Sequence, residues 1–119
     1  MRISFSTLLI ACCLVVSCVA ASVSWTKVAS WTGSGIKDTE TFTVASKEWR
    51  IAWETKNEPF AGAGVLQIYV YDDKDKMVAL AANKQGPGKD VSYVRSAGKH
   101  YLKISSANID WAVTVEDQR

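Results

Sequence analysis

The stretch that decides the fold is residues 98–116, which read GKHYLKISSANIDWAVTVE. Alternate positions are apolar in its first half, and every other position of residues 109–115 is a large apolar residue. A period of two is typical of half-buried strands in an antiparallel sheet. Because Asn108 tolerates the left-handed backbone of a tight turn, we predict a β-hairpin whose turn lies at residues 105–108.

Six earlier runs repeat this pattern; large apolar residues share one face in the first five, and the facing of the sixth is ambiguous. They lie at residues 24–31, 40–44, 48–54, 65–72, 77–82 and 90–95. All seven glycines and both prolines fall between the runs, where turns are expected. In the fifth run we expect Val78 and Leu80 to face inward. Since eight short strands cannot all bury one face in a single flat sheet, we predict an all-β fold, an antiparallel two-sheet sandwich.

The first segment of the chain has the features of an export signal. Arg2 gives a basic start, residues 8–16 form an uninterrupted apolar run, and residues 17–21 are rich in small side chains. The apolar run is shorter than the roughly 20 residues of a membrane-spanning helix. We therefore predict an export signal at residues 1–21 and a single β-sandwich domain at residues 22–119.

Two cleavage sites compete in this segment. Residues 19–21, before Ser22, resemble a site for the general signal peptidase, which would yield a secreted protein. Residues 15–18, Val-Val-Ser-Cys, resemble the lipobox of bacterial lipoproteins, with Val where Leu is usual. Cleavage there would leave Cys18 as a new N-terminus that carries a thioether-linked diacylglycerol. We favour the lipoprotein, and we expect the exported protein at the cell envelope, attached to the membrane through Cys18.

Composition narrows the chemistry of the domain. The three cysteines all lie at or before position 18, so disulfides, zinc thiolate sites and cysteine nucleophiles are not expected in the domain. Arg2 is the only charged residue among residues 1–21, so the domain is close to neutral. A neutral domain has neither the basic footprint of a nucleic-acid-binding protein nor a polybasic membrane patch. No cofactor is expected.

Two polar features are candidates for a catalytic or a metal site. His100 is the single histidine, and a Ser-His-Asp relay needs a base that a carboxylate orients towards a nucleophile. We expect His100 on the surface, without a catalytic role. Residues 72–76 read DDKDK, but a calcium site needs six or more converging oxygen ligands. We expect a solvated hairpin turn there, and we assign no catalytic or metal-ligating residue.

Two aromatic pairs are the candidate binding residues. Trp25 and Trp31 lie on the same nominal face of the first run, and Tyr69 and Tyr71 share an outer face of the fourth. Exposed aromatic rings stack on sugar rings and anchor protein partners. Burial at the sandwich edge, or packing between neighbouring strands, is the alternative role for both pairs.

A resemblance adds to this interpretation. Residues 98–104, followed by an apolar last strand at 111–115, resemble the close of bacterial pre-peptidase C-terminal-type β-sandwich domains, which often end in a Gly-x-Tyr-Tyr-leucine-like strand and a last apolar strand. Residues 68–73 with 77–80 are similar to their central hairpin, and the likeness covers about residues 40–116. The resemblance implies a jelly-roll-like sandwich of about eight strands with an accessory or binding role. It implies no catalytic residue.

These observations lead to one functional prediction with two alternatives. The prediction is a non-enzymatic, exported and lipid-anchored domain, similar to small exported sandwich proteins of bacteria, that binds a protein partner or a glycan at the cell envelope. The first alternative is a structural or assembly module of the envelope. The second is a small hydrolase, which would require a deep pocket that holds His100 with a carboxylate in reach.

Overall fold

The computed structural model describes residues 23–118. The predicted export signal, its cleavage sites and Cys18 lie outside these residues. Within them the chain forms nine strands and no helix, and therefore no helix that could cross a membrane. The strands are β2 (Trp25–Gly33), β3 (Lys37–Asp38), β4 (Phe42–Val44), β5 (Trp49–Lys56), β6 (Val65–Asp72), β7 (Met77–Gln85), β8 (Gly88–Val94), β9 (Gly98–Ala107) and β10 (Asp110–Gln118).

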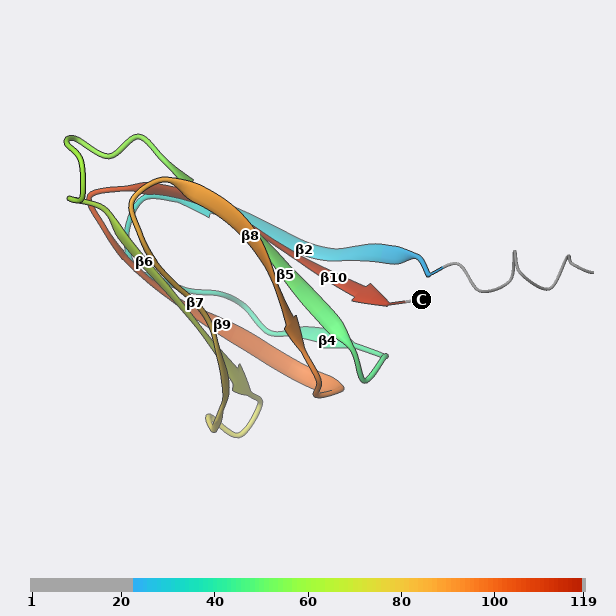
Figure 1. The fold of residues 1–119 in the computed structure, drawn as a ribbon. Coiled ribbons are helices and arrows are strands. Elements are labelled where there is room, and N and C mark those ends of the chain that lie inside the picture. The colour runs from blue at the N-terminus through green and yellow to red at the C-terminus, as the bar shows by residue number, and fades with distance from the viewer. Residues whose placement is uncertain (1–22, 119) are drawn as a thin grey trace, which may run out of the picture.

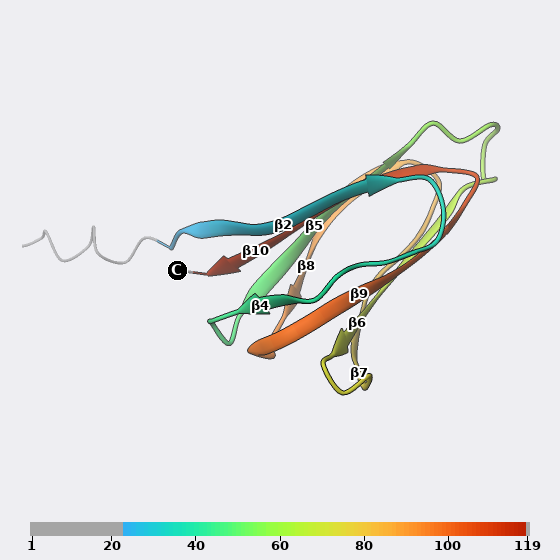
Figure 2. The ribbon, with the colours of Figure 1, turned by 180° about the vertical axis from the view of Figure 1, so that it is seen from behind.

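The strands form two antiparallel sheets that pack face to face (Figures 1 and 2). One sheet has the order β2-β10-β5-β8, and the other has the order β3-β9-β6-β7 with β4 also paired to β9. We call them the four-stranded and the five-stranded sheet. The prediction of an all-β, two-sheet antiparallel sandwich is confirmed.

Short β3 and β4 together take the place of one strand along β9. Asp38 pairs with Lys103 and Phe42 with His100, so the chain has one extra residue between them. At this bulge the Thr39 hydroxyl accepts a hydrogen bond from the amide of Leu102 at 3.0 Å, in place of a backbone carbonyl. Counting β3 and β4 as one strand gives an eight-stranded sandwich.

The pairing of these eight strands is that of a jelly roll. β2 pairs with β10, β3 and β4 pair with β9, β5 pairs with β8, and β6 pairs with β7. The chain is thus one long antiparallel ribbon that turns at residues 73–76 and is rolled into two sheets. Since Trp25 pairs with Gln118, the start of β2 and the end of β10 lie at the same end of the sandwich (Figures 1 and 2).

The core lies between the sheets and is built from the predicted apolar faces. Its buried side chains come from every strand except β2 and β3, and the partly buried Val28 and Trp31 add to them from β2. They are Phe42, Val44, Trp49, Ile51, Trp53, Leu66, Ile68, Val70, Ala82, Val94, Leu102, Ile104, Trp111, Val113 and Val115. Each large apolar side chain contributes about 1.5–3 kcal/mol to the free energy of unfolding when it is buried. Because residues 23–118 contain no cysteine, this burial rather than disulfide bonding stabilises the sandwich.

The prediction of a terminal hairpin is wrong. β9 and β10 follow each other around a tight turn at Asn108, which has the expected left-handed φ of 58°, but they belong to different sheets. β9 also extends to Ala107, further than expected. The reason is burial: Ile104 and Val113 enter the core from opposite sheets and are both fully buried, whereas a hairpin would place both on one face of one sheet.

The expected inward positions of β7 are also wrong. Val78 and Leu80 are 37% and 50% exposed, while the alanines between and after them pack on the core. The pairing of β7 with β6 shifts register twice, between Ile68 and Tyr69 and between Val70 and Tyr71. Each extra residue moves the side chains that follow to the other face.

Candidate functional site

The two candidate tryptophans lie on opposite faces of β2, so the prediction that they share a face is wrong. Lys27 pairs with Glu116 and Ala29 with Val115, which leaves Val28 as an extra residue in a bulge. Beyond the bulge, Trp31 turns inward, where its ring lies 5.9 Å from Phe42. Its indole nitrogen donates a hydrogen bond of 2.7 Å to the Glu40 carboxylate. Trp31 therefore closes the sandwich edge, the alternative role weighed for it.

Trp25 belongs to a fixed group on the outer face of the four-stranded sheet. The guanidinium carbon of Arg50 lies 4.2 Å from the centre of the Trp25 ring. The Arg50 Nε donates to Glu116 Oε1 at 2.6 Å, and both side chains are about one-quarter exposed. The Tyr93 ring lies 5.9 Å from that of Trp25, at 59° to it, and is 58% exposed. We call Trp25, Arg50, Tyr93 and Glu116 the aromatic wall.

Beside the aromatic wall, the centre of the sheet carries small outward side chains. On β5, Ala52 pairs with Thr114 on one side and Val91 on the other. One step along the sheet, Ala112 pairs with Glu54. Outward positions of a solvated sheet commonly carry long or β-branched side chains, so these residues leave a depression.

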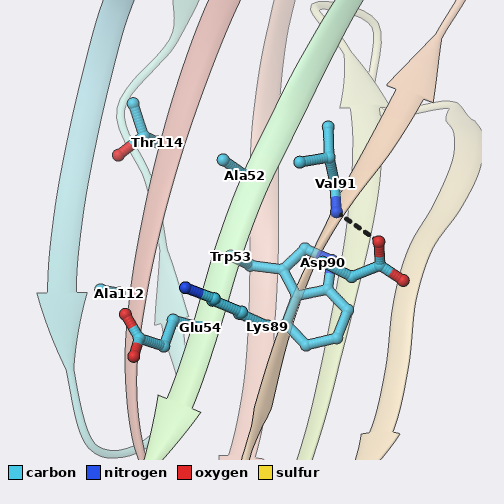
Figure 3. Close-up of a pocket in the computed structure, with 8 residues that line it drawn as sticks. All are labelled: Ala52, Trp53, Glu54, Lys89, Asp90, Val91, Ala112 and Thr114. Atoms are coloured by element: carbon cyan, nitrogen blue, oxygen red, sulfur yellow. Dashed lines mark hydrogen bonds between the residues drawn. The ribbon is translucent and has the colours of Figure 1, made fainter.

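The depression is a hollow of about 450 Å³ over β5, β8 and β10 (Figure 3). Its lining is Ala52, Trp53, Glu54, Lys89, Asp90, Val91, Ala112 and Thr114. A second hollow of about 360 Å³ shares Glu54 and Ala112 with it and continues towards Lys56 and Asp110. We call the two hollows together the outer trough. The volume of each hollow falls in the range of roughly 300–1,000 Å³ that is usual for ligand sites.

Charges of both signs lie along the outer trough. Figure 3 shows the Lys89 side chain reaching across β5 to the side of Glu54 at one end of the first hollow, with the Glu54 carboxylate directed away from β8. Asp90 accepts a hydrogen bond from the amide of Val91 at 2.7 Å. In the second hollow, Asp110 accepts one from the Asn57 amide group at 2.9 Å. The rim thus offers both donors and acceptors, while the floor offers methyl groups and a hydroxyl.

Tyr69 and Tyr71 lie on the outer face of the five-stranded sheet, whereas the outer trough lies on the four-stranded sheet. The Tyr69 hydroxyl donates to Gln67 Oε1 at 3.2 Å. The Tyr71 ring stacks on Tyr101 at 5.4 Å with 19° between the planes, and the Lys103 ammonium lies over it at 5.2 Å. Both tyrosines are therefore engaged in packing along and between β6 and β9, as the alternative role proposed.

The stacked rings of Tyr71 and Tyr101 are linked to the turn at residues 73–76 by a hydrogen bond. Tyr101 donates to Asp75 at 2.9 Å, and burial together with this carboxylate raises the pKa of Tyr101 to about 12. Asp72 accepts hydrogen bonds from the backbone of Lys76 and Lys74, both at 2.9 Å, which lower the pKa of Asp72. The acidic run forms the predicted hairpin turn. Nowhere in residues 23–118 do three or more His, Cys, Asp or Glu side chains lie close enough together to hold a metal ion.

His100 is buried, so the prediction of a surface histidine is wrong. The side chain is 1% exposed and its ring lies 5.2 Å from that of Trp49. Its ring nitrogens lie 3.2 Å from Gly98 O and 3.2 Å from Ser96 Oγ. Burial lowers the pKa of His100. The alternation of inward residues along the strand could have predicted this burial, because His100 is two residues from the inward Leu102.

Asp117 is a buried residue that sequence analysis missed. It is fully buried, and its two carboxylate oxygens accept hydrogen bonds from the amides of Ala45 at 2.8 Å and Ser46 at 3.3 Å. It thereby holds the connection between β4 and β5. Asp117 continues the inward alternation of β10 after Val115, so its position was predictable although its residue type is polar.

The comparisons with known proteins identify no family. No family model matches the chain, and no curated protein matches it. The chain is a small β-sandwich domain. Distant likenesses among solved structures are to chains in the structures of infectious bursal disease virus strain Gx (TM-score 0.43, 8% identity, 80% of this chain and 30% of that one) and strain Gt (0.42, 10%, 81% and 32%). A third is the VP2 protein of that virus (0.40, 10%, 81% and 31%). The chain spans less than one-third of the length of each.

Proposed function

We propose that this chain is a non-enzymatic, exported binding domain, anchored through a lipid on Cys18, that binds a component of the cell envelope in the outer trough. The observation that carries the proposal is the depression over Ala52, Ala112 and Thr114 on the outer face of the four-stranded sheet, beside the exposed ring of Tyr93. The resemblance to pre-peptidase C-terminal-type domains supports an accessory or binding role.

The trough suits binding because its floor is rigid. β5 and β10 are the two inner strands of the four-stranded sheet, with hydrogen-bonded neighbours on both sides. Their inward side chains Ile51 and Val113 are fully buried in the core. Sites that strands hold in this way keep their geometry better than sites on loops, which lowers the entropy lost on binding.

The interior position of His100 favours binding over hydrolysis. A general base must reach the proton that it removes from a substrate or nucleophile. His100 lies between the sheets, with its nitrogens directed at Gly98 O and Ser96 Oγ, and it does not line the outer trough.

The proposed anchor would hold the trough near the membrane. Seven peptide units separate Cys18 from Trp25, the first residue of β2. At about 3.3–3.6 Å for each extended residue, they span at most about 25 Å. A domain tethered so closely would meet ligands of the envelope before ligands in solution.

The test is retention on an envelope fraction of the source organism. The full-length, processed protein is purified in detergent and mixed with detergent-extracted envelope, so that the lipid anchor cannot partition into membrane. Ala52→Arg fills the floor of the trough, and Ser105→Arg is the matched control, because Ser105 lies on an inner strand of the other sheet and pairs with Gln67 on its outer face.

We expect the wild type and Ser105→Arg to be retained and Ala52→Arg to be washed off, with equal melting temperatures for the two variants. Retention of Ala52→Arg at the wild-type level would contradict the assignment of the trough. Failure of the wild type to be retained would contradict the binding function. Mass spectrometry of the mature N-terminus tests the anchor: acylated Cys18 supports it, and a free Ser22 refutes it.

A further inference from the structure

We infer that the occupant of the outer trough is an uncharged oligosaccharide segment of the envelope, recognised through its ring faces and hydroxyl groups. This inference rests on the proposed function and deepens it. It follows from the floor, the rim and the wall of the trough, taken in turn.

The floor combines methyl and hydroxyl groups. Ala52 and Ala112 present only methyl groups, and the Thr114 hydroxyl lies 3.2 Å from that of Ser30 on the neighbouring strand. A pyranose ring likewise has an apolar face of C–H groups and an edge of hydroxyl groups. The floor can therefore contact the ring face without leaving a polar group unpaired, which would cost binding free energy.

The rim carries charges of both signs, with no excess of basic groups. Glu54, Lys89 and Asp90 line the first hollow, and Lys56 and Asp110 join Glu54 in the second. On the aromatic wall, Arg50 is already paired with Glu116. An anionic ligand would meet carboxylates in both hollows, and a cationic ligand would meet ammonium groups. An uncharged ligand can use both kinds of side chain as hydrogen-bond donors and acceptors.

The wall provides one accessible aromatic ring. Trp25 has Arg50 against its ring, whereas Tyr93 is 58% exposed. Tyr93 lies two residues along β8 from Val91, which lines the first hollow. Its ring can therefore stack on a sugar ring at the margin of the trough.

A protein partner fits this surface less well. Stable protein interfaces bury about 1,000 Å² or more and centre on large anchor residues. Here the centre holds alanine and threonine, and the exposed aromatic ring is at the margin. A narrow chain of rings matches a trough with a small-residue floor better than a flat protein surface does.

The experiment uses the same retention assay with treated envelope. One portion of the detergent-extracted envelope is oxidised with mild periodate, which cleaves vicinal diols of sugars, and the reagent is quenched. A second portion is digested with protease. The full-length protein is then added at about 0.05 M and about 0.5 M NaCl, across which surface charge interactions become strongly screened.

We expect retention to be lost after periodate, to persist after protease, and to be unchanged by salt. Tyr93→Leu should weaken it about three- to tenfold, the size of a single aromatic contact, and Tyr93→Phe should restore it. Retention that survives periodate but not protease would overturn the inference in favour of a protein partner and leave the proposed function standing. Loss of retention at high salt would overturn the uncharged character of the ligand.

Discussion

A single methyl group at Gly33 should measurably destabilise the fold. Gly33 pairs with Trp111 at the end of β2. A Cβ atom on Gly33 would lie 2.8 Å from Cζ2 of Trp111, with two further ring atoms at 3.2 and 3.3 Å. The indole cannot retreat freely, because it is 3% exposed and its nitrogen donates to Gly35 O at 2.9 Å. Inserting a group into such a packed site costs about 1–3 kcal/mol.

The assay is thermal and urea unfolding of Gly33→Ala, with Gly35→Ala as the matched control. No atom lies within 4 Å of a Cβ built on Gly35. For a domain of this size, each kcal/mol lowers the melting temperature by about 4–8 °C. In a Trp111→Phe background the shorter ring should relieve more than half of the Gly33→Ala penalty. Equal stability of wild type and Gly33→Ala, or equal losses in both glycine variants, would refute the packing argument.

Three further predictions concern other buried and exposed groups. Burial lowers the pKa of His100 below its usual 6.5, so protonation favours the unfolded chain. The free energy of unfolding should therefore be highest above about pH 6.5 and decrease as the pH falls below it. His100→Gln should flatten this pH dependence in urea unfolding. Trp111→Ala should cost about 3–5 kcal/mol, because its indole is buried, while Trp25→Ala should cost less than about 1.5 kcal/mol; calorimetry that gives equal losses would contradict the outer position of Trp25. Asp117→Ala should cost about 1–3 kcal/mol, because two backbone amides lose their acceptor, and denaturant unfolding with no change would show that water replaces the carboxylate.

Alternation of apolar residues located the strands but could not assign their partners. The pattern shows which face of a strand is apolar, and both Ile104 and Val113 are fully buried as expected. It does not show which strand lies opposite, so the pattern predicts one hairpin for β9 and β10, which in fact lie in two sheets. The jelly-roll pairing is set by contacts between strands that are distant in the sequence.

Bulges explain why the alternation of apolar residues predicts the wrong face for some side chains. The extra residue at Val28 turns Trp31 inward, and the register shifts of β6 and β7 turn Leu80 outward. A bulge adds one residue to one strand and depends on its partner, so it leaves little trace in a single sequence. His100 and Asp117 are the reverse case: the alternation of apolar residues places both positions inward, although both side chains are polar.

The outer trough could not be read from the sequence. Ala52, Ala112 and Thr114 are ordinary residues in their own strands. They form a depression only because the topology places β5 beside β10, and Val91 on β8 beside Ala52. Tyr93 was within a predicted strand whose facing was ambiguous, and its exposure becomes informative only next to this floor.

The most direct test of the binding face is hydroxyl-radical footprinting of the full-length protein, free and bound to detergent-extracted envelope, read by mass spectrometry. Tyr93 is 58% exposed beside the outer trough, and Met77 is 53% exposed on β7 of the other sheet, so both should be oxidised in the free protein. Binding in the trough predicts protection of Tyr93 with unchanged oxidation of Met77. Protection of Met77 with Tyr93 still reactive would contradict the account, because it would place the ligand on the five-stranded sheet.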